Sequence, residues 1–277
     1  MARHFELASI IVSTYNRPEA LRAVLSALAD QTDRAFEVIV ADDGSGPETA
    51  ALVRDWGKAA TVPVRHAWQE DDGFRAARGR NNATRMAKGD YLVFLDGDCV
   101  PRPHFLAAHR RLAERGWFVR GTRASLAGSL TRRVESEGLA AHRRSLARWL
   151  MSTAKRDIKD VSPLLAWPSE RFRKRTPHRW RGVQTCNLGV WAEDYLAVDG
   201  LDESYEGWGM EDADLAVRLI RSERFRKEGK FATAVLHLWH PPNDRAALAE
   251  NQRLFDDTLH GDRIRARVGL SSHETGS

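Results

Sequence analysis

The first hundred residues of the chain alternate between short apolar runs and segments with helical periodicity. The apolar runs cover residues 9–13, 37–41, 62–66 and 91–96. The helical segments between them cover residues 18–28, 47–56 and 76–86. Strands that alternate with helices predict an α/β domain in which helices flank a mostly parallel sheet. Pro63 cannot donate a ladder hydrogen bond, so we expect the third strand at an edge or starting near this residue.

Polar side chains follow three of these predicted strands, namely Asn16, Asp43 and Asp98. Ligands of open parallel sheets bind outside the carboxyl ends of the strands, so one cleft is expected to collect all three. The segment Leu95-Asp96-Gly97-Asp98 places two carboxylates at such an end, where hard cations and phosphates can be held. Taken alone, an Asp-Gly pair is more often an exposed turn.

The remainder of the chain is less regular. Helical patterns cover residues 103–115, 139–151 and 210–220, with a last helix that ends near Leu259. Strand patterns cover residues 182–191 and 231–238. Asn243 or Asp244 is expected to cap the last helix. The 139–151 segment is amphipathic and basic, which suits either a membrane surface or packing on the main domain.

Basic residues are concentrated in one region of the chain. Between Arg132 and Arg181 there are 14 Lys or Arg residues against five acids, and the segments 171–175 and 178–181 interleave them with aromatic side chains. Such a region suits contact with anionic lipid, nucleic acid or a phosphorylated substrate. Charge runs are as often solvated loops, and both interpretations stay open at this point.

Composition indicates a globular protein of a reducing compartment. Charged residues make up 29% and apolar residues 42% of the chain, and Cys99 and Cys186 are the only cysteines, so a disulfide framework is not indicated. The N-terminal residues contain no stretch of signal-peptide type, and no apolar run approaches the ~20 residues that span a bilayer. We therefore expect a cytoplasmic protein, whose basic region offers a peripheral contact with the inner face of an anionic membrane.

Four motifs together resemble a known family. The segments 10–17, 40–45 and 95–98 resemble family 2 glycosyltransferases of the GT-A fold, and Gly207-Trp208-Gly209-Met210-Glu211-Asp212 resembles the acceptor-side motif of β-1,4-galactosyltransferases and chondroitin-polymerase-like enzymes. The motifs occur in the family's order over residues 8–240. The resemblance implies an inverting, metal-dependent transfer of a sugar from a UDP-sugar to a glycan or lipid-linked glycan, in surface polysaccharide or lipopolysaccharide synthesis.

The resemblance also implies a metal site. Asp98 matches the metal carboxylate of the family, while Asp96 faces the ribose or a metal-bound water, and Gly97 allows the backbone to approach the sugar phosphate closely. His237 and His240 match positions that supply metal ligands in the related galactosyltransferases. Mixed imidazole and carboxylate ligation suits Mn²⁺, with Mg²⁺ as the alternative. Strand alternation leaves a second interpretation, in which His237 faces the core and only His240 binds.

Residues for the donor nucleotide follow from the same resemblance. In the family, the ends of the first two strands contact uracil and ribose, which here assigns Thr14, Tyr15, Asn16, Arg17 and Asp43 to donor binding. Asp42 or Asp43 instead caps the helix at Pro47 if these residues are purely structural.

A second donor-side segment precedes the Asp-x-Asp strand. Phe74 is expected to stack on uracil, and Arg78 to contact the diphosphate or to orient Asp96. A solvated helix face is an equal interpretation for Arg75 and Arg80.

For the acceptor side, Asp212 is the expected catalytic base, because an inverting transfer needs one carboxylate to accept the proton of the attacking hydroxyl. A helix that starts near Met210 would keep Asp212 ionised through its dipole. Glu211 and Trp208 are expected to bind the acceptor. Asn187 either contacts a sugar or only satisfies local backbone groups. Ala213 stands where some galactosyltransferases have an acid used for the acceptor, so their acceptor preference is not carried over.

We therefore divide the chain into four parts. They are a nucleotide-sugar-binding half (1–125), a basic and partly helical insertion (126–181), an acceptor and catalytic half (182–260) and a C-terminal tail (261–277). The rival functions are a non-catalytic nucleotide-sugar or glycan-binding module, and a basic nucleic-acid-binding protein. The motifs favour the enzyme, with no nucleic acid as a partner.

Overall fold

Within residues 4–165 and 170–273, which the computed structural model describes, seven strands form one sheet in the order β3-β2-β1-β4-β8-β6-β9. The strands are β1 (Ala8–Thr14), β2 (Phe36–Asp42), β3 (Val64–Trp68), β4 (Tyr91–Asp96), β6 (Trp117–Arg120), β8 (Asn187–Trp191) and β9 (Phe225–Glu228). Strands β3, β2, β1 and β4 are parallel to one another, while β8 runs antiparallel to β4 and to β6. The predicted α/β fold is confirmed, and β3 lies at the edge as Pro63 predicted.

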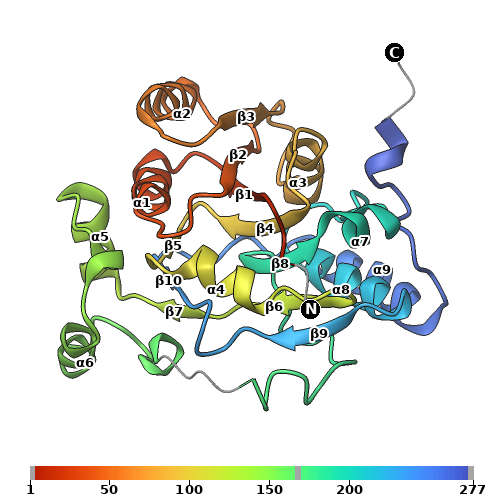
Figure 1. Cartoon of the computed structure of the whole chain (residues 1–277). Coiled ribbons are helices and arrows are strands. Elements are labelled where there is room, and N and C mark those ends of the chain that lie inside the picture. Colours follow the sequence, from red (N-terminus) through yellow and green to blue (C-terminus); the bar gives the residue numbers. More distant parts are fainter. Residues whose placement is uncertain (1–3, 166–169, 274–277) are drawn as a thin grey trace.

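Helices cover both faces of this sheet (Figure 1). Helices α1 (Pro18–Ala29) and α2 (Pro47–Ala59) share a core with Ile10 and Val12 of β1. Helices α3 (Ala76–Arg85), α7 (Ala192–Ala197) and α8 (Glu211–Arg221) share a core with Ile11. Side chains alternate across a strand, so the continuous apolar run of β1 supplies both cores, as expected for a strand buried on both faces.

A small second sheet brings residues 235–237 next to the residues that follow β4. Its strands β5 (Cys99–Pro101), β10 (Val235–His237) and β7 (Arg123–Ser125) lie in the order β5-β10-β7. The register pairs His237 with Cys99. Because Cys99 directly follows Asp98, this pairing carries His237 to the end of β4. Two segments nearly 140 residues apart in the sequence therefore meet at one point.

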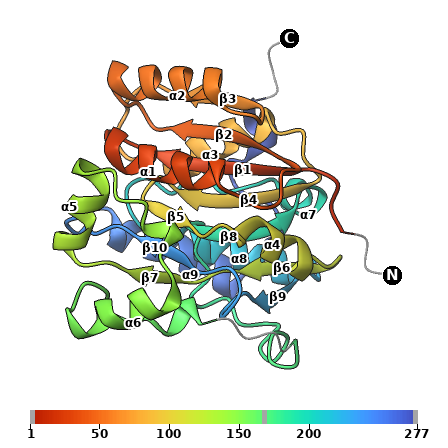
Figure 2. The same cartoon turned by 60° about the vertical axis from the view of Figure 1, so that its left-hand side comes forward.

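The remaining helices lie around these sheets (Figure 2). They are α4 (Phe105–Leu112), α5 (Gly128–Ser136), α6 (Leu146–Ala154) and α9 (Leu248–His260), with short 3₁₀ turns at Ala141–Arg143, Ser162–Leu164 and Leu270–His273. The predicted 139–151 helix is corrected: it is divided into a 3₁₀ turn and α6. The Ser145 side chain accepts a hydrogen bond from the Arg148 amide, which is how a cap starts a new helix.

Two further element predictions are wrong. The last strand begins at Val235 rather than at residue 231, because Phe231 has a positive φ of 66° that interrupts extended backbone. The last helix begins at Leu248 with Ala247 at its N-cap. Asp244 accepts from the Ala246 amide instead, so it orders the turn before the helix. Strand β9 carries the sequence Phe-Arg-Lys-Glu, whose charge concealed it from a hydrophobic pattern.

The C-terminal segment predicted as a tail is held against the domain through residue 273. Leu270 is buried, and the Ser271 hydroxyl donates to Asp199. Residues 274–277 of that prediction lie outside the described part of the chain. No helix in the described part is both long and apolar enough to cross a membrane.

Candidate active site

The carboxyl ends of β1, β2 and β4 open into a cleft of about 470 Å³. Its lining includes most of the residues predicted for the donor: Thr14, Tyr15, Asn16, Arg17, Asp43, Phe74, Asp96 and Gly97. Asp98 and His240 line it as well. The strand ends therefore gather Asn16, Asp43 and Asp98 in one place, as the alternation of strands and helices predicted.

Asp43 is the buried acid of the cleft. Its Oδ1 accepts from Gln69 Nε2 at 2.6 Å and its Oδ2 from the Arg75 amide at 2.8 Å. Burial raises the pKa of Asp43. These two donors hold the carboxylate in place at the cleft wall, and each oxygen keeps a further acceptor site.

The capping alternative for the acids after β2 is wrong. Helix α2 has Gly46 at its N-cap and receives no side-chain cap. Asp42 instead accepts from the Ser45 amide at 2.8 Å and contacts His66 Nε2 at 2.8 Å. It therefore orders the turn that leads away from the strand.

The loop after β1 is strained and tightly held. Asn16 has a positive φ of 46°, and its side-chain oxygen accepts from the Gly46 amide at 3.0 Å. Its own amide donates to Ser45 Oγ at 2.8 Å. Non-glycine residues persist in this region only when their surroundings over-determine them. The Tyr15 ring lies half exposed at the cleft, with its hydroxyl donating to Asp71.

Arg80, not Arg78, orients Asp96. The Arg80 side chain is only 7% exposed, and its Nη2 donates to Asp96 Oδ1 at 2.8 Å. Arg78 is exposed on α3 and is absent from the described lining of the cleft. The prediction for Arg78 is corrected for a helical reason: Ala76, Gly79 and Arg80 form the face of α3 toward the cleft, and residue 78 points away from it.

The Asp-x-Asp segment has a packing reason for its glycine. A Cβ on Gly97 would lie 2.8 Å from the Ser13 carbonyl oxygen, to which the Gly97 amide donates at 2.7 Å. Asp96 accepts from Ser13 Oγ at 2.8 Å. The glycine therefore lets the ends of β1 and β4 approach, and both acids stay at the cleft.

Asp98, His237 and His240 form a candidate metal centre. Their ligand atoms lie within 4.8 Å of one another. His237 Nε2 is 3.7 Å from Asp98 Oδ1, and His240 Nε2 is 3.6 Å from Asp98 Oδ2. Both imidazoles face the carboxylate, so the arrangement supports the interpretation in which both histidines are ligands.

The protonation of these imidazoles suits a cation. His240 Nδ1 lies 2.6 Å from the Pro241 carbonyl, so Nδ1 carries a proton and Nε2 is the ring nitrogen that faces Asp98. Burial, aided by Arg123, lowers the pKa of His237 to about 4, so this ring is neutral at pH 7. The donor set of two imidazoles and a carboxylate fits Mn²⁺.

Arg17 neutralises the same carboxylate. Its Nη1 lies 2.8 Å from Asp98 Oδ2, and its Nη2 lies 2.7 Å from Glu135 Oε1. Burial and repulsion from Asp96 raise the pKa of Asp98, while Arg17 and His240 oppose this rise. The Arg17 guanidinium thus compensates the charge of Asp98, whose side chain is 15% exposed and is repelled by Asp96.

The Gly-Trp-Gly segment forms a turn before α8. Gly207, Gly209 and Met210 all have positive φ, at 70°, 112° and 77°. This turn places Glu211 and Asp212 in the first turn of the helix. The Gly207 amide also donates to the Phe74 carbonyl at 2.9 Å, so the acceptor-side motif is bonded to the donor-side loop.

Glu211 and Asp212 differ in their surroundings. Burial and the neighbouring Asp212 raise the pKa of Glu211 to about 8. Burial also raises the pKa of Asp212, against Arg80 and a hydrogen bond from Thr185 Oγ1 at 2.7 Å. The expectation that the dipole of α8 keeps Asp212 ionised stays a prediction, and burial acts against it. A raised pKa strengthens a base.

Arg80 joins the two acidic segments. Burial lowers the pKa of Arg80, but the charges of Asp96, Asp212 and Glu211 raise it by more. One guanidinium in the wall of the cleft is thus close to both the Asp-x-Asp acid and the proposed base.

Comparison with known proteins identifies this arrangement. The model of glycosyl transferase family 2 matches residues 9–165, which is more than half of the 277 residues. The chain belongs to glycosyltransferase family 2. A second model, described as the N-terminal domain of galactosyltransferase, matches residues 170–234. The resemblance drawn from the motifs is confirmed.

The chain is similar to several curated proteins. It is 33% identical to validoxylamine A glucosyltransferase of Streptomyces hygroscopicus subsp. jinggangensis (strain 5008) over 230 residues, covering 78% of this chain and 52% of the relative. It is 30% identical to the hyaluronan synthase of Pasteurella multocida over 231 residues, covering 79% of this chain and 23% of the relative. The chain thus spans about half of the first and about a quarter of the second.

Solved structures show the fold. S. aureus TarS 1-349 matches with a TM-score of 0.59 and 16% identity, covering 92% of this chain and 66% of that one. The mannosyltransferase PcManGT of Pyrobaculum calidifontis, solved with GDP-Man and Mn²⁺, matches with a TM-score of 0.57 and 18% identity, covering 90% and 61%. The family 2 chain therefore has the GT-A fold.

Two residues predicted for the acceptor have different surroundings in this family 2 chain. Asn187 is buried: its amide nitrogen donates to the carbonyls of Thr122 and Thr233, and its oxygen lies 3.2 Å from His109 Nε2. The structure supports the backbone-satisfying interpretation of Asn187. Trp208 is half-buried with the Arg245 guanidinium 5.1 Å from its ring centre, and its contact with the acceptor stays a prediction.

The basic segment 171–181 of this family 2 chain is bonded within the domain. Arg173 donates to the carbonyls of Glu228 and Lys230, and Lys174 lies 2.6 Å from Glu114. These contacts use cations that a nucleic-acid surface needs free. They tie these side chains to the domain, whereas the predicted solvated loop would leave them in water.

Sequence reasoning missed four residues of the site. They are Gln69, Arg80, Glu135 and Thr185. The helical spacing from Ala76 to Arg80 was a usable signal, because it puts residue 80 rather than 78 on the inner face. The other three reach the site through long-range packing, which no local pattern encodes.

Proposed function

We propose that the chain is an inverting, metal-dependent glycosyltransferase that moves a sugar from a UDP-sugar to a glycan or lipid-linked glycan. One observation carries the proposal: Asp98 with His237 and His240 forms one group, Asp212 forms a second, and the buried guanidinium of Arg80 is bonded to Asp96 and close to Asp212. The first group suits a leaving diphosphate, and the second suits an attacking hydroxyl.

Asp98, His237 and His240 would hold the divalent cation, Mn²⁺ or Mg²⁺. When bound, such an ion offsets the negative charge that grows on the diphosphate as the glycosidic bond breaks. Arg17 adjoins Asp98 at 2.8 Å and supplies further positive charge at this end of the cleft. The solved relative with GDP-Man and Mn²⁺ supports a nucleotide-sugar and a divalent cation in this fold.

The nucleotide is assigned to the opposite end of the cleft. Asp43, held by Gln69 and the Arg75 amide, presents acceptor capacity to an N–H of the uracil ring. The exposed faces of Tyr15 and Phe74 offer stacking surface. TarS has been solved in complex with UDP, which supports a uridine nucleotide as the leaving group.

Asp212 is the proposed base. Its Oδ1 accepts from Thr185 Oγ1 at 2.7 Å, which orients the carboxylate and leaves Oδ2 for the acceptor hydroxyl. As the acceptor hydroxyl oxygen forms its bond to the anomeric carbon, Asp212 takes the hydroxyl proton. The bond from that carbon to the diphosphate breaks on the opposite face, which inverts the configuration. Glu211, with a pKa of about 8, is neutral at pH 7 and can donate a hydrogen bond to the acceptor.

Surface polysaccharide or lipopolysaccharide synthesis is the proposed setting. The support is the similarity to hyaluronan and chondroitin synthases and the match to the galactosyltransferase model over residues 170–234. Ala213 replaces an acid of some galactosyltransferases, so a different acceptor is expected.

A screen of UDP-sugars for Mn²⁺-dependent UDP release tests the proposal, because donor hydrolysis reports the sugar even without the acceptor. We expect release with one or a few donors and its loss in Asp98→Ala and Asp212→Asn. Retained turnover in both variants would refute the mechanism. Binding of UDP that ignores Mn²⁺, or salt-sensitive binding to arbitrary DNA, would instead favour a binding module or a nucleic-acid protein.

Peripheral contact with an anionic membrane is proposed through α6, which lies at the edge of the molecule (Figures 1 and 2). Leu146, Leu150 and Met151 expose 38%, 52% and 59% of their surface, while Trp149 anchors the opposite face in the core. Arg148 and Lys155 are exposed beside them. An apolar ridge flanked by cations is the surface that binds anionic lipid.

A further inference from the structure

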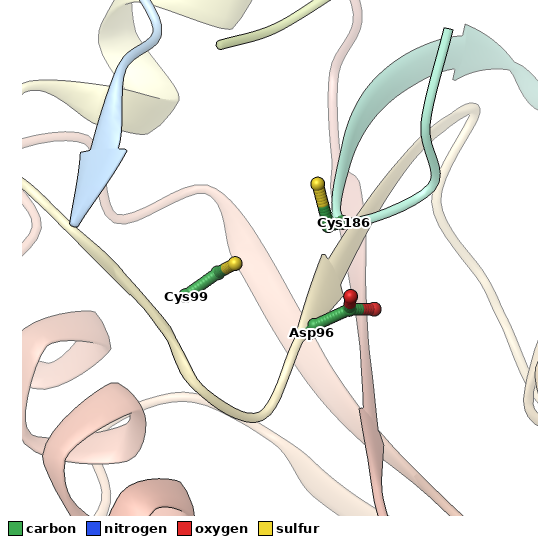
Figure 3. Close-up of side chains that lie close together, drawn as sticks. All are labelled: Asp96, Cys99 and Cys186. Atoms are coloured by element: carbon green, nitrogen blue, oxygen red, sulfur yellow. The ribbon is translucent and has the colours of Figure 1, made fainter. Parts of the chain in front are cut away.

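The two cysteines of the chain lie together beside Asp96 (Figure 3). The Sγ atoms of Cys99 and Cys186 and one Asp96 carboxylate oxygen lie within 4.8 Å of one another. Cys99 begins β5, three residues after Asp96, and Cys186 immediately precedes β8. The antiparallel pairing of Leu95 with Asn187 places Cys186 across from Asp96, so the backbone itself sets this group.

The three ligand residues lie between two cavities. Asp96 lines the donor cleft, and Cys186 lines a separate cavity of about 300 Å³. That second cavity also has Arg120, Arg123, Asp160, Gln184 and Lys230 in its lining. Cys99 is fully buried between the two. Cys186 therefore faces a cavity other than the donor cleft.

The donor atoms select a different ion from that of the histidine centre. Thiolates prefer Zn²⁺ and related d¹⁰ ions, whereas Mn²⁺ prefers oxygen and nitrogen ligands. Two thiolates and one carboxylate around a divalent ion leave one excess negative charge. Arg123 Nη1 lies 3.8 Å from Cys186 Sγ, and Arg80 is bonded to Asp96. The Arg123 guanidinium offsets that charge from just outside the ligand set.

We propose that Asp96, Cys99 and Cys186 bind one thiophilic divalent ion of the Zn²⁺ and Cd²⁺ class. This ligand set shares no residue with Asp98, His237 and His240, but it adjoins that centre, because Cys99 Sγ lies 3.6 Å from Asp98 Oδ1. The thiol protons leave to solvent as the metal–sulfur bonds form. Asp96 would then turn its carboxylate from Arg80 and Ser13 to the ion. If the proposed function holds, this movement inhibits donor binding, because Asp96 faces the donor cleft.

A Cd²⁺ titration in saturating Mn²⁺ tests the site, because cadmium–thiolate bonds absorb in the ultraviolet and Mn²⁺ does not bind thiolates well. The chain has two cysteines only, so a thiolate band in the wild-type protein can arise from these residues alone. We expect one Cd²⁺ per chain with this band. We expect the band in His240→Ala, which removes a ligand of the other centre, and its loss in Cys186→Ser.

Absence of the band in the wild-type chain, or its persistence unchanged in Cys186→Ser, would overturn the proposal. The wild-type measurement decides on its own should the serine variant fail to fold, which circular dichroism reports. A turnover assay separates this inference from the proposed function. A chain that shows the band but transfers no sugar supports the ion site and contradicts the proposed function. A chain that transfers sugar but shows no band contradicts the ion site alone.

Discussion

Arg80 Nη2 donates a 2.8 Å hydrogen bond to Asp96 Oδ1 from a side chain that is 7% exposed. The same guanidinium is close enough to Asp212 and Glu211 for their charges to raise its pKa. The donor and acceptor motifs are thus joined by a third segment, on α3. Within the described residues, Arg80 Nε and Nη1 are buried and have no hydrogen-bond partner.

Arg80→Ala is expected to reduce kcat/KM by about 10²-fold or more, the effect of losing a preorganised donor at a developing charge. It should also lower the free energy of unfolding by about 3 kcal/mol, since it leaves buried acids unpaired. Steady-state kinetics and urea denaturation measure the two effects. Arg78→Ala is the matched control, because it removes an exposed arginine of the same helix. Equal activity in both variants would contradict the assignment.

Glu211 makes stability fall as pH rises. Its folded pKa of about 8 lies above the unfolded value of about 4.3, so the folded state binds the extra proton between these values. The penalty for ionising Glu211 is therefore absent below pH 4, grows through this window and is complete above pH 8. Glu211→Gln should remove this part of the slope and be more stable than wild type at pH 8.5. Urea denaturation at pH 6 and 8.5 tests this, and parallel slopes would exclude it.

The metal centre predicts a linked effect on nucleotide binding. Calorimetry should show that Mn²⁺ tightens UDP binding by about tenfold or more, which is about 1.4 kcal/mol. In His240→Ala this gain should disappear, while UDP binding without Mn²⁺ persists because Asp43 and its partners are intact. His260→Ala removes an exposed histidine of α9 and serves as control. A retained Mn²⁺ effect in His240→Ala would point to another ligand set.

The local features of the fold were predictable from the sequence. Strand β4 begins at Tyr91 and ends at Asp96, the bounds of the apolar run. Such runs are local, and burial on both faces makes them continuous. The charged strand β9 has no such run, because it pairs only with β6 in the sheet order, and an edge strand needs less apolar surface.

The site was predictable where a family motif marks it, and less so where packing builds it. Asp98 and His240 follow motifs, and the structure brings them together. The resemblance also gave His237, but the pairing of β10 with β5 that brings it to Asp98 is a long-range contact that no periodicity shows. Asn187 illustrates the converse. Its side-chain amide donates to the carbonyls of Thr122 and Thr233, and only the folded chain reveals these partners.

Helix α6 predicts binding to anionic vesicles. Replacing Leu150 and Met151 together by Asp removes exposed apolar surface and adds negative charge, so vesicle co-sedimentation should weaken by about tenfold or more. Binding of the wild type should also fall with salt. Leu196→Asp on α7 is the matched control, because Leu196 is 54% exposed on another helix. Equal losses in the two variants would show a nonspecific charge effect and remove α6 from the membrane interface.

Gly207 predicts a rescue experiment. A Cβ at this position would lie 2.7 Å from Ala247 Cβ, and its φ is 70°. Gly207→Ala should therefore cost about 1–2 kcal/mol for the left-handed backbone and about 1–3 kcal/mol more for the clash. Gly138→Ala isolates the first cost, because Gly138 has a φ of 65° and nothing within 4 Å of its Cβ.

Adding Ala247→Gly to Gly207→Ala removes the opposing methyl group. The double variant should regain most of the free energy of unfolding that the clash removes. Its remaining loss should approach the loss in Gly138→Ala plus the loss in Ala247→Gly alone. A double-mutant cycle by urea denaturation measures this coupling. Purely additive losses would show that the clash is relieved elsewhere. In that case the turn before α8 tolerates a side chain at position 207.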